Sequence, residues 1–490
     1  MVTLHSVQMD RAVGVVVASA AGDALGSHNE FGPSLPDDAP VMFGVGYFGH
    51  DVGEWTDDTS MALPALEALS RGESLIDAGT LGGIVGRWLA WARTAKDIGS
   101  QTSSVFARLH GVATETAARS AARAVHEASG RSGGNGSLMR TGPVALGYLD
   151  DGREAELVEA AGRIAQLTHW EPDNLDACAI WCLAIRHAVR TGELAIREQV
   201  RWIPAERQER WLALIDEALA PGSHPRAFAQ GNGWVVKAFQ GALAAVAGST
   251  SLVDALERAV RGGHDTDTVA AIAGSLAGAM DGFTQVPLAW QRILHGWPGY
   301  TVADLIRLAL LAANAGQPTA SSGWPDVTQV PTAHWLHTAP LRHPHDDGVW
   351  LGSQSALAEL SDTVDAVVSL SRVGTLEIPP GLESIRVWLV DTDGLNANLD
   401  YVLTQVVDLI ADLRAEGHVV FVHCAEARSR TAAVAALYSA RRRGVPLGQA
   451  WSDIQATLPY YDPAPFLQRA VERIVTSAAP APTSRDSRLP

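Results

Sequence analysis

The sequence predicts a protein of two domains, an all-α bundle followed by an α/β domain. From the start of the chain to about residue 315, apolar residues recur at intervals of three and four, and alternating strand patterns are scarce. After a segment rich in Pro, Gly, Ser and Thr at 312–332, short β-branched runs alternate with helical patterns. The 490 residues are enough for two or three domains, each with its own core.

The first domain is expected to span residues 1–315 and to consist of helices. Its segments repeatedly end in Gly or a polar turn, as helices do. The clearest of them read "TSMALPALEALSRG", "LDACAIWCLAIRHAVRTG", "ERWLALIDEALAPG" and "TVAAIAGSLAGAM". We therefore expect a helical bundle whose polar motifs lie in the loops at helix ends.

The second domain is expected at 333–475, after a linker at 316–332. The runs "DAVVSLS", "SIRVWLVD" and "HVVFVHC" are typical of buried strands, and "LDYVLTQVVDLIADLRAEG" is typical of a helix between them. This order of strands and helices predicts an α/β domain. The tail at 476–490 lacks an apolar pattern and is expected to be disordered.

Composition excludes several classes of protein. The net charge of −17 argues against binding nucleic acid by phosphate neutralisation and against lying on anionic lipid. The apolar stretch near the N-terminus is broken by Gly22 and Asp23, so we expect a cytoplasmic protein without a membrane span. Three cysteines do not make a disulfide framework, and Cys178 and Cys182 read as buried core thiols.

Two clusters of carboxylates and hydroxyls precede apolar helices. Residues 56–59 read Thr-Asp-Asp-Thr and residues 265–268 read Asp-Thr-Asp-Thr. A helix start needs one such side chain as its cap, and an acid in the first turn suits the helix dipole, so each cluster alone has a structural explanation. Together they hold more acids than caps use, and converging carboxylates repel unless a cation neutralises them. Ligand sets made only of oxygen suit Mg²⁺, with Mn²⁺ as the alternative.

At these residues the sequence resembles the ADP-ribosylglycohydrolase family, over about residues 10–315. The matching segments are "AAGDALGSHNE", "WTDDTSMAL", "GGNGSLMRTGPVAL", "LTHWEPDNLDAC", "GNGWVVKAFQGAL" and "GGHDTDTVAAIAGSLAGA". The resemblance implies an all-α fold around two Mg²⁺ ions. By the same resemblance the metal ligands are Thr56, Asp57, Asp58, Asp265, Asp267 and Thr268.

The resemblance also implies residues on the substrate side of the site. Glu30 corresponds to the family's mobile glutamate, which approaches the scissile bond, and His169 corresponds to a contact with the substrate. The loop along the ADP-ribose phosphates corresponds to Gly134, Asn135, Gly136 and Ser137. One departure is His264, which stands where family members commonly have a glycine.

The second domain has a cluster of its own in "HVVFVHCAEARSRTAAVAALY", at 418–438. A strand ends at Cys424, and a helix begins near Arg430 after a short bend. Backbone N–H groups and a helix N-terminus at such a junction lower a thiol pKa and bind phosphate. Arg430 can hold a phosphate by two hydrogen bonds, and Thr431 can assist hydrolysis.

This segment resembles the Cys-x5-Arg loop of the protein tyrosine and dual-specificity phosphatases, and the resemblance covers about 333–475. It implies attack by the Cys424 thiolate on phosphate, with an aspartic acid protonating the leaving oxygen and without a metal cofactor. Asp391 and Asp393 are the candidates for that acid, and the spacing favours Asp393. Ala427 replaces the family's usual glycine, so its β-carbon would strain the loop if the backbone needs a positive φ.

The leading hypothesis is a Mg²⁺-dependent ADP-ribosylhydrolase fused to a cysteine-dependent phosphatase. Its partners would be an ADP-ribosylated protein and a phosphorylated substrate. Two alternatives stay open: a reader that binds such partners without turnover, and a hydrolase of a free metabolite related to ADP-ribose. Activity on protein conjugates against free conjugates separates them.

Overall fold

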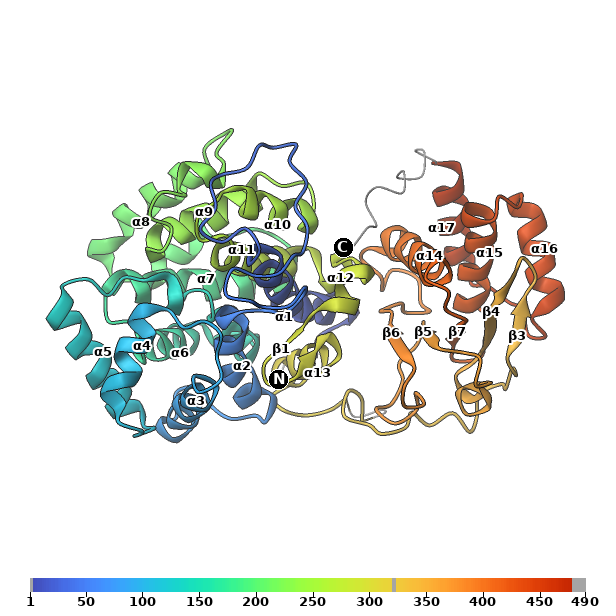
Figure 1. The fold of residues 1–490 in the computed structure, drawn as a ribbon, viewed down its shortest axis with the longest axis horizontal. Helices are drawn as coiled ribbons and strands as arrows, with labels where there is room; N and C mark the ends of the chain where they lie inside the picture. Colours follow the sequence, from blue (N-terminus) through green and yellow to red (C-terminus); the bar gives the residue numbers. More distant parts are fainter. Residues whose placement is uncertain (1–2, 320–322, 478–490) are drawn as a thin grey trace. The chain divides into compact units, whose positions relative to one another are not determined.

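The computed structural model describes residues 3–319 and 323–477, and these divide into two units. The first unit comprises residues 1–286 and 293–317, and the second comprises residues 287–292 and 318–490. Helices make up most of the first unit and a sheet lies at the centre of the second, which confirms the predicted fold class (Figure 1). Residues 478–490, most of the tail that we expected to be disordered, lie outside the described residues.

Two long antiparallel helices, α1 and α11, form the centre of the first unit (Figure 1). Glycines allow them to approach closely, because a β-carbon on Gly14 would collide with the backbone of Gly278. Farther along, Gly26 lies against the backbone of Asp267 in the same way. The C-terminal end of α1 therefore lies beside the N-terminal end of α11, and the candidate site is at this place.

The other elements of the first unit surround this pair. Buried Leu, Val, Ala and Trp side chains fill the space between them. A two-stranded antiparallel sheet is a small departure from the predicted all-α domain. The helices are α1 (Ser6–Gly26), α2 (Asp57–Ser70), α3 (Ala78–Trp91), α4 (Ser100–Leu109), α5 (Glu115–Ser129), α6 (Glu154–Gln166), α7 (Pro172–Thr191), α8 (Ala205–Ala218), α9 (Val235–Ala247), α10 (Leu252–Arg261), α11 (Thr266–Asp281) and α13 (Val302–Ala313), and the strands are β1 (His295–Gly296) and β2 (Tyr300–Thr301).

The second unit is built on a five-stranded sheet of order β3-β4-β7-β5-β6. β3 runs antiparallel to β4, and the remaining neighbours are parallel. The central strand β7 is buried throughout. Its last residue, Cys424, lies at the carboxyl end of the parallel strands. The elements are α12 (Leu288–Ile293), β3 (Leu341–His343), β4 (Asp346–Ser353), β5 (Ala366–Ser369), β6 (Glu383–Arg386), α14 (Leu399–Ala415), β7 (Val420–Cys424), α15 (Arg430–Arg442), α16 (Leu447–Thr457) and α17 (Pro465–Thr476).

Every helix within residues 3–319 and 323–477 is too short or too polar to cross a bilayer. The three cysteines are free thiols, and Cys178 and Cys182 are buried on α7, as the sequence predicts.

Candidate active site

Three buried carboxylates meet where α1, α2 and α11 come together. Asp23 lies near the end of α1, Asp58 in the first turn of α2 and Asp267 in the first turn of α11. One oxygen from each lies within 4.8 Å of the others. The two clusters found in the sequence therefore converge, and a third acid joins them.

The hydroxyl of Thr56 serves the carboxylates instead of capping α2. Thr56 is the N-cap residue, but its side chain makes no capping hydrogen bond. Its Oγ1 donates to Asp23 Oδ1 at 2.8 Å and lies 3.2 Å from Asp58 Oδ2. Thr59 donates to Asp23 Oδ2 from its backbone N at 3.0 Å and from its hydroxyl at 2.6 Å. Asp23 thus holds the start of α2 in place at the site.

At the start of α11, as at the start of α2, the side chain of the N-cap residue does not cap the helix. Asp265 is the N-cap residue without a side-chain capping bond, and Thr268 N donates to Asp267 Oδ1 at 2.8 Å. Thr268 Oγ1 reaches across to Asp58 Oδ2 at 3.4 Å. Asn135 Nδ2 donates to Asp265 Oδ2 at 2.8 Å, so the 134–137 loop is joined to this cluster.

Burial and mutual repulsion raise the pKa of these acids. Burial, followed by the charges of the neighbouring carboxylates, holds the pKa values of Asp57, Asp58 and Asp267 well above the usual range. Within the described residues Asp58 Oδ1 is buried without a hydrogen-bond partner. An oxygen-only set with an unpartnered buried carboxylate oxygen fits a divalent cation such as Mg²⁺.

Glu30 lies at the margin of this cluster, just beyond α1. Burial is the main cause that raises its pKa to about 8, and the charges of Asp97 and Asp265 add to it, while a hydrogen bond with Asp267 lowers it. The pKa of Asp97 is raised to about 6, again mainly by burial. Glu30 therefore lies close enough to the carboxylate cluster to form a hydrogen bond with Asp267.

His169 lies under the 134–137 loop and is connected to Arg140 through a hydroxyl. Arg140 Nη2 donates to Thr168 Oγ1 at 2.7 Å, and that oxygen lies 2.7 Å from His169 Nδ1. Because the hydroxyl can donate one hydrogen bond and accept two, it pairs with either ring tautomer of His169. Nε2 of His169 lies on the side of Gly134 and Gly136.

The same surroundings keep His169 neutral. Burial, with the charge of Arg140 as a second cause, lowers its pKa well below the usual value. Ser137 is fully buried, and its hydroxyl accepts from Asn174 Nδ2 at 2.7 Å. The side chain of Ser137 therefore faces the core, and Asn135 Nδ2 donates to Asn232 O at 3.0 Å as well as to Asp265.

Sequence reasoning missed several residues of this site. Asp23 had a signal, because a carboxylate inside an otherwise apolar helix needs a reason to be buried. Asn232 lies in one of the matching segments, and it fixes the chain before α11 by donating to Gly263 O at 3.1 Å. Arg140 and Thr168 also lie in matching segments, whereas Asp97 lies outside them and had no sequence signal.

His264 occupies a backbone position that suits glycine. Its φ is +63°, and Phe31, whose N donates to His264 O at 2.6 Å, has a φ of +60°. His264 N in turn donates to Gly32 O at 2.8 Å. Two residues in the left-handed region thus connect the Glu30 segment to the start of α11, each at a cost of about 1–3 kcal/mol.

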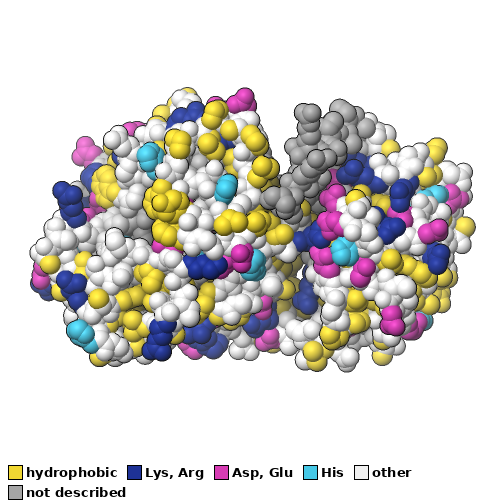
Figure 2. Space-filling view, in the orientation of Figure 1, with side chains coloured by type: hydrophobic (Ala, Val, Ile, Leu, Met, Phe, Trp, Pro, Cys, Tyr) yellow, Lys and Arg dark blue, Asp and Glu magenta, His cyan; other side chains and the backbone are white. Residues whose placement is uncertain are grey.

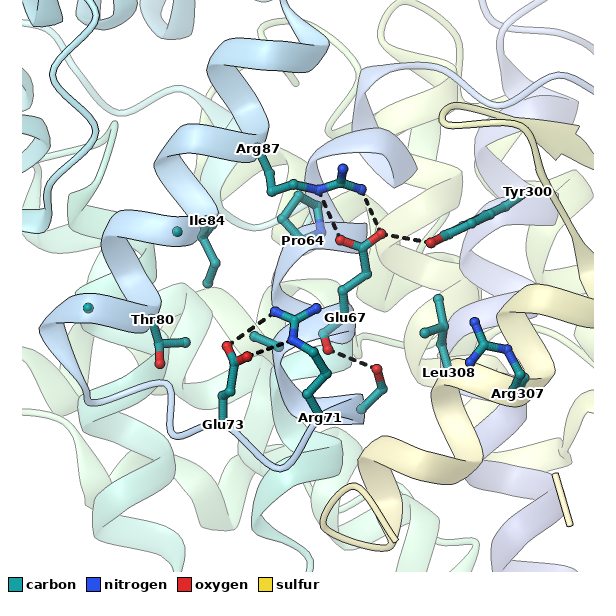
Figure 3. A pocket seen from close by; sticks show the side chains of 14 residues that line it. Pro64, Glu67, Arg71, Glu73, Thr80, Ile84, Arg87, Tyr300, Arg307 and Leu308 are labelled. Atoms are coloured by element: carbon teal, nitrogen blue, oxygen red, sulfur yellow. Dashed lines mark hydrogen bonds and ion pairs between the residues drawn. The ribbon is translucent and has the colours of Figure 1, made fainter. Parts of the chain in front are cut away.

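A cavity of about 810 Å³ opens elsewhere in the first unit, between α2, α3 and α13 (Figure 3). Two of its arginines have acidic partners: Arg87 pairs with Glu67 at 2.7 Å, and Arg71 pairs with Glu73 at 2.6 Å. Tyr300 also donates to Glu67 at 2.9 Å. We therefore assign no ligand to this cavity.

In the second unit, Cys424 and Arg430 enclose the bend between β7 and α15. Cys424 is buried at the end of β7, and Arg430 is the first residue of α15. Arg430 Nη1 donates to the carbonyls of Leu370 and Leu389, both at 2.9 Å, while its Nε has no hydrogen-bond partner in the described part of the chain. The guanidinium is therefore held through Nη1, and its buried Nε lies 3.5 Å from the carboxylate of Asp391.

The two candidate acids occupy different positions in this unit. Asp391 Oδ1 accepts from Ser429 Oγ at 2.8 Å, and its Oδ2 lies 3.5 Å from Arg430 Nε. Asp393 is 71% exposed and forms an ion pair with Arg469 at 3.1 Å. The spacing in the sequence favoured Asp393, but Asp391 contacts the loop, because the turn after β6 directs the earlier residue toward α15.

The backbone of Ala427 lies in the left-handed region, where the sequence predicts strain for a residue other than glycine. Its φ is +58°, and its side chain is 1% exposed. An L-residue with a β-carbon is strained there, whereas glycine is not. Nearby, His423 is buried with its pKa lowered to about 4 by burial, and Thr431 Oγ1 is buried without a partner in the described residues.

Known proteins resemble the first unit in sequence. ADP-ribosylarginine hydrolase Tri1 of Pseudomonas putida (strain GB-1) is 30% identical over 288 residues, which are 58% of this chain and 73% of that protein. ADP-ribosyl-dinitrogen reductase glycohydrolase of Rhodospirillum rubrum is 28% identical over 292 residues, 57% of this chain and 89% of that protein.

Among solved structures, a chain of an ADP-ribosylglycohydrolase-related protein complex is 27% identical and covers 63% of this chain and 99% of that one, with a TM-score of 0.45. Human DUSP28 is 24% identical and covers 31% of this chain and 98% of that one, with a TM-score of 0.25. The sequence model described as ADP-ribosylglycohydrolase matches residues 4–320. Because this match spans more than half of the chain and includes every acid of the three-helix cluster, the chain belongs to the ADP-ribosylglycohydrolase family.

Proposed function

We propose that the first unit is a Mg²⁺-dependent hydrolase that removes ADP-ribose from an arginine side chain of a protein. The observation that carries this proposal is the convergence of Asp23, Asp58 and Asp267 with an unpartnered buried oxygen on Asp58. The arginine linkage is supported by the printed activity of the Pseudomonas relative, an ADP-ribosylarginine hydrolase.

In this proposal the chain's own residues bind and orient the substrate. The 134–137 loop and His169 contact the ADP-ribose, and Glu30 holds or moves a proton beside the scissile bond. The metal-holding residues are Thr56, Asp57, Asp58, Asp265, Asp267 and Thr268, with Asp23 positioning Thr56. Mg²⁺, when bound, supplies charge that orients ribose hydroxyls and favours ionisation of water.

The experiment is hydrolysis of an arginine-linked ADP-ribosylated peptide by the full chain, with Mg²⁺ or with EDTA, followed by released ADP-ribose. We expect release with Mg²⁺ and its loss with EDTA. A serine-linked peptide and free ADP-ribosylarginine serve as comparison substrates. Tight binding of ADP-ribose without release from any substrate would contradict the proposal and favour a reader, whereas release from the free conjugate alone would favour a small-metabolite hydrolase.

For the second unit we propose a cysteine-dependent phosphatase. The supporting observation is a thiol at the end of the central strand β7, followed at the start of α15 by Arg430, whose Nη1 is anchored by two carbonyls. The Cys424 sulfur would attack phosphorus, the bond to the leaving oxygen would break, and an acid would protonate that oxygen. Water would then hydrolyse the phosphocysteine, which releases phosphate and restores the thiol. Turnover of p-nitrophenyl phosphate, lost in Cys424→Ser, is the test. Equal turnover by the variant would contradict it.

A further inference from the structure

An exposed cluster of aromatic rings lies next to Glu30. Phe31, Tyr47 and Phe48 contact one another edge to face, with ring centroids 5.0, 5.1 and 6.0 Å apart. They are 58%, 65% and 40% exposed, respectively. All three come from residues 27–56, the segment between α1 and α2 (dark blue in Figure 1). We call these three residues the aromatic cluster.

This concentration of exposed apolar surface is unusual within the molecule. Of the ten large hydrophobic side chains that are exposed in the described residues, five come from this segment: Phe31, Met42, Val45, Tyr47 and Phe48. Such a patch on a soluble protein is typical of an interaction site. Hydrophobic side chains are exposed among charged ones on the face of the first unit seen in Figure 2.

The cluster is held rigidly against the candidate active site. Tyr47 N donates to Ser27 O at 3.1 Å, at the end of α1. Phe31 is fixed by its hydrogen bond to His264, the residue directly before Asp265. The chain accepts a φ of +60° at Phe31 to keep this arrangement. Strain retained at one position beside a site points to a functional demand.

Charge defines what the cluster can bind. Residues 12–70 contain no Lys or Arg, and residues 30–54 contain five acids. Two of these acids are ion-paired, Asp37 with Arg226 at 2.5 Å and Glu54 with Lys96 at 2.6 Å. Asp38 and Asp51 have no ion pair among the described contacts. An exposed aromatic surface in an acidic segment complements a cation, and guanidinium groups stack on aromatic faces.

We propose that the aromatic cluster is the docking surface for the protein part of the substrate, and that it binds basic side chains flanking the modified arginine. The proposal rests on the proposed hydrolase function and adds a preference for acceptor segments rich in Arg or Lys. Small conjugates without flanking residues do not reach the cluster, so they are recognised by the carboxylate site and the 134–137 loop alone.

The test compares two substrates: an arginine-ADP-ribosylated peptide with flanking Arg and Lys, and free ADP-ribosylarginine. For a Tyr47→Ala, Phe48→Ala variant we expect the ratio of kcat/KM for the peptide to that for the free conjugate to fall roughly tenfold, through KM. Tyr47→Phe, Phe48→Tyr keeps both rings and should keep the ratio. Val112→Ala removes another exposed side chain of this unit, 51% exposed, and should leave both substrates unchanged.

Other results would overturn the docking surface. An unchanged ratio in the alanine variant would do so, as would a change in oligomeric state on size exclusion with unchanged kinetics, since a second copy would then be the occupant. If the protein without substitutions hydrolysed neither substrate, the proposed hydrolase function would be contradicted. The docking surface would then be judged by titrating an unmodified Arg-rich peptide, whose binding should weaken in the alanine variant and should be absent for a Glu-rich peptide.

Discussion

The two units prepare their reactive groups in opposite electrostatic ways. At the first site, Asp23, Asp58 and Asp267 are buried together; burial raises the pKa of each, and repulsion by neighbouring carboxylates adds to the rise at Asp58 and Asp267. The second site already contains a cation, Arg430 at the start of α15, whose Nε lies 3.5 Å from the carboxylate of Asp391. In the proposed functions a cation completes the first site and an anion such as phosphate binds at the second. Each unit can therefore be tested with a ligand that should not affect the other.

The largest expected effect sharpens the assignment within the second site. Asp391→Asn removes the carboxylate that accepts from Ser429 and lies near Arg430. We expect phosphatase kcat to fall about a hundredfold or more, as it does when a general acid is lost. Asp393→Asn, the matched control, removes only a surface ion pair and should change kcat less than about twofold. The reverse ranking would restore the assignment favoured by the sequence.

The next effect concerns support of the first site. Asp23→Asn weakens the acceptor that holds Thr56 and Thr59, and we expect ADP-ribose release to fall about 10–100-fold at fixed Mg²⁺. Asp10→Asn is the control, because Asp10 is also a buried acid of α1 that accepts from a threonine, Thr284, at 2.7 Å. It should lower the melting temperature without weakening Mg²⁺ dependence. Equal losses of activity in both variants would reduce Asp23 to a structural role.

A smaller effect tests the strain at Ala427. Ala427→Gly removes the β-carbon at a φ of +58°, and should stabilise the second unit by about 1 kcal/mol and raise phosphatase turnover. Ala315→Gly, at a φ of +50° in the first unit, should also stabilise but leave phosphatase turnover unchanged. Calorimetry and p-nitrophenyl phosphate turnover are the measurements. A destabilised Ala427→Gly protein would show that the loop does not store strain.

The smallest effect is an opposite pH response of the two units. In EDTA, raised folded-state pKa values at Glu30, about 8, and Asp97, about 6, contribute stability at low pH that is lost as pH rises from 5 to 8. In the second unit, His343 and His423 have pKa values lowered to about 4, so stability present above pH 6.5 is lost as pH falls toward 4. Hydrogen exchange of the full chain, resolved by unit, measures both trends. Parallel trends would contradict the comparison.

The same comparison shows what sequence reasoning reaches. The two acidic clusters are evident in the sequence because each exceeds what a helix cap needs, and the starts of α2 and α11 bring them together. The role of Asp23 could not be predicted from the sequence, because a single acid in an apolar helix does not indicate its partners. The fold brings Thr56 and Thr59 to it. The choice between Asp391 and Asp393 depended on the direction of one turn, which spacing does not determine. For Ala427 the sequence gives only a condition, strain if the backbone needs a positive φ, and the φ of +58° meets it.

The most direct test measures both activities of the full chain in two variants, one with a substitution in each unit. Asp58→Asn should abolish Mg²⁺-dependent release of ADP-ribose from the arginine-linked peptide and leave p-nitrophenyl phosphate turnover unchanged. Cys424→Ser should do the reverse. Two results would contradict the proposed division of the two activities between the two units. One is that either variant removes both activities, and the other is that the Asp58→Asn variant releases ADP-ribose as fast as the protein without substitutions.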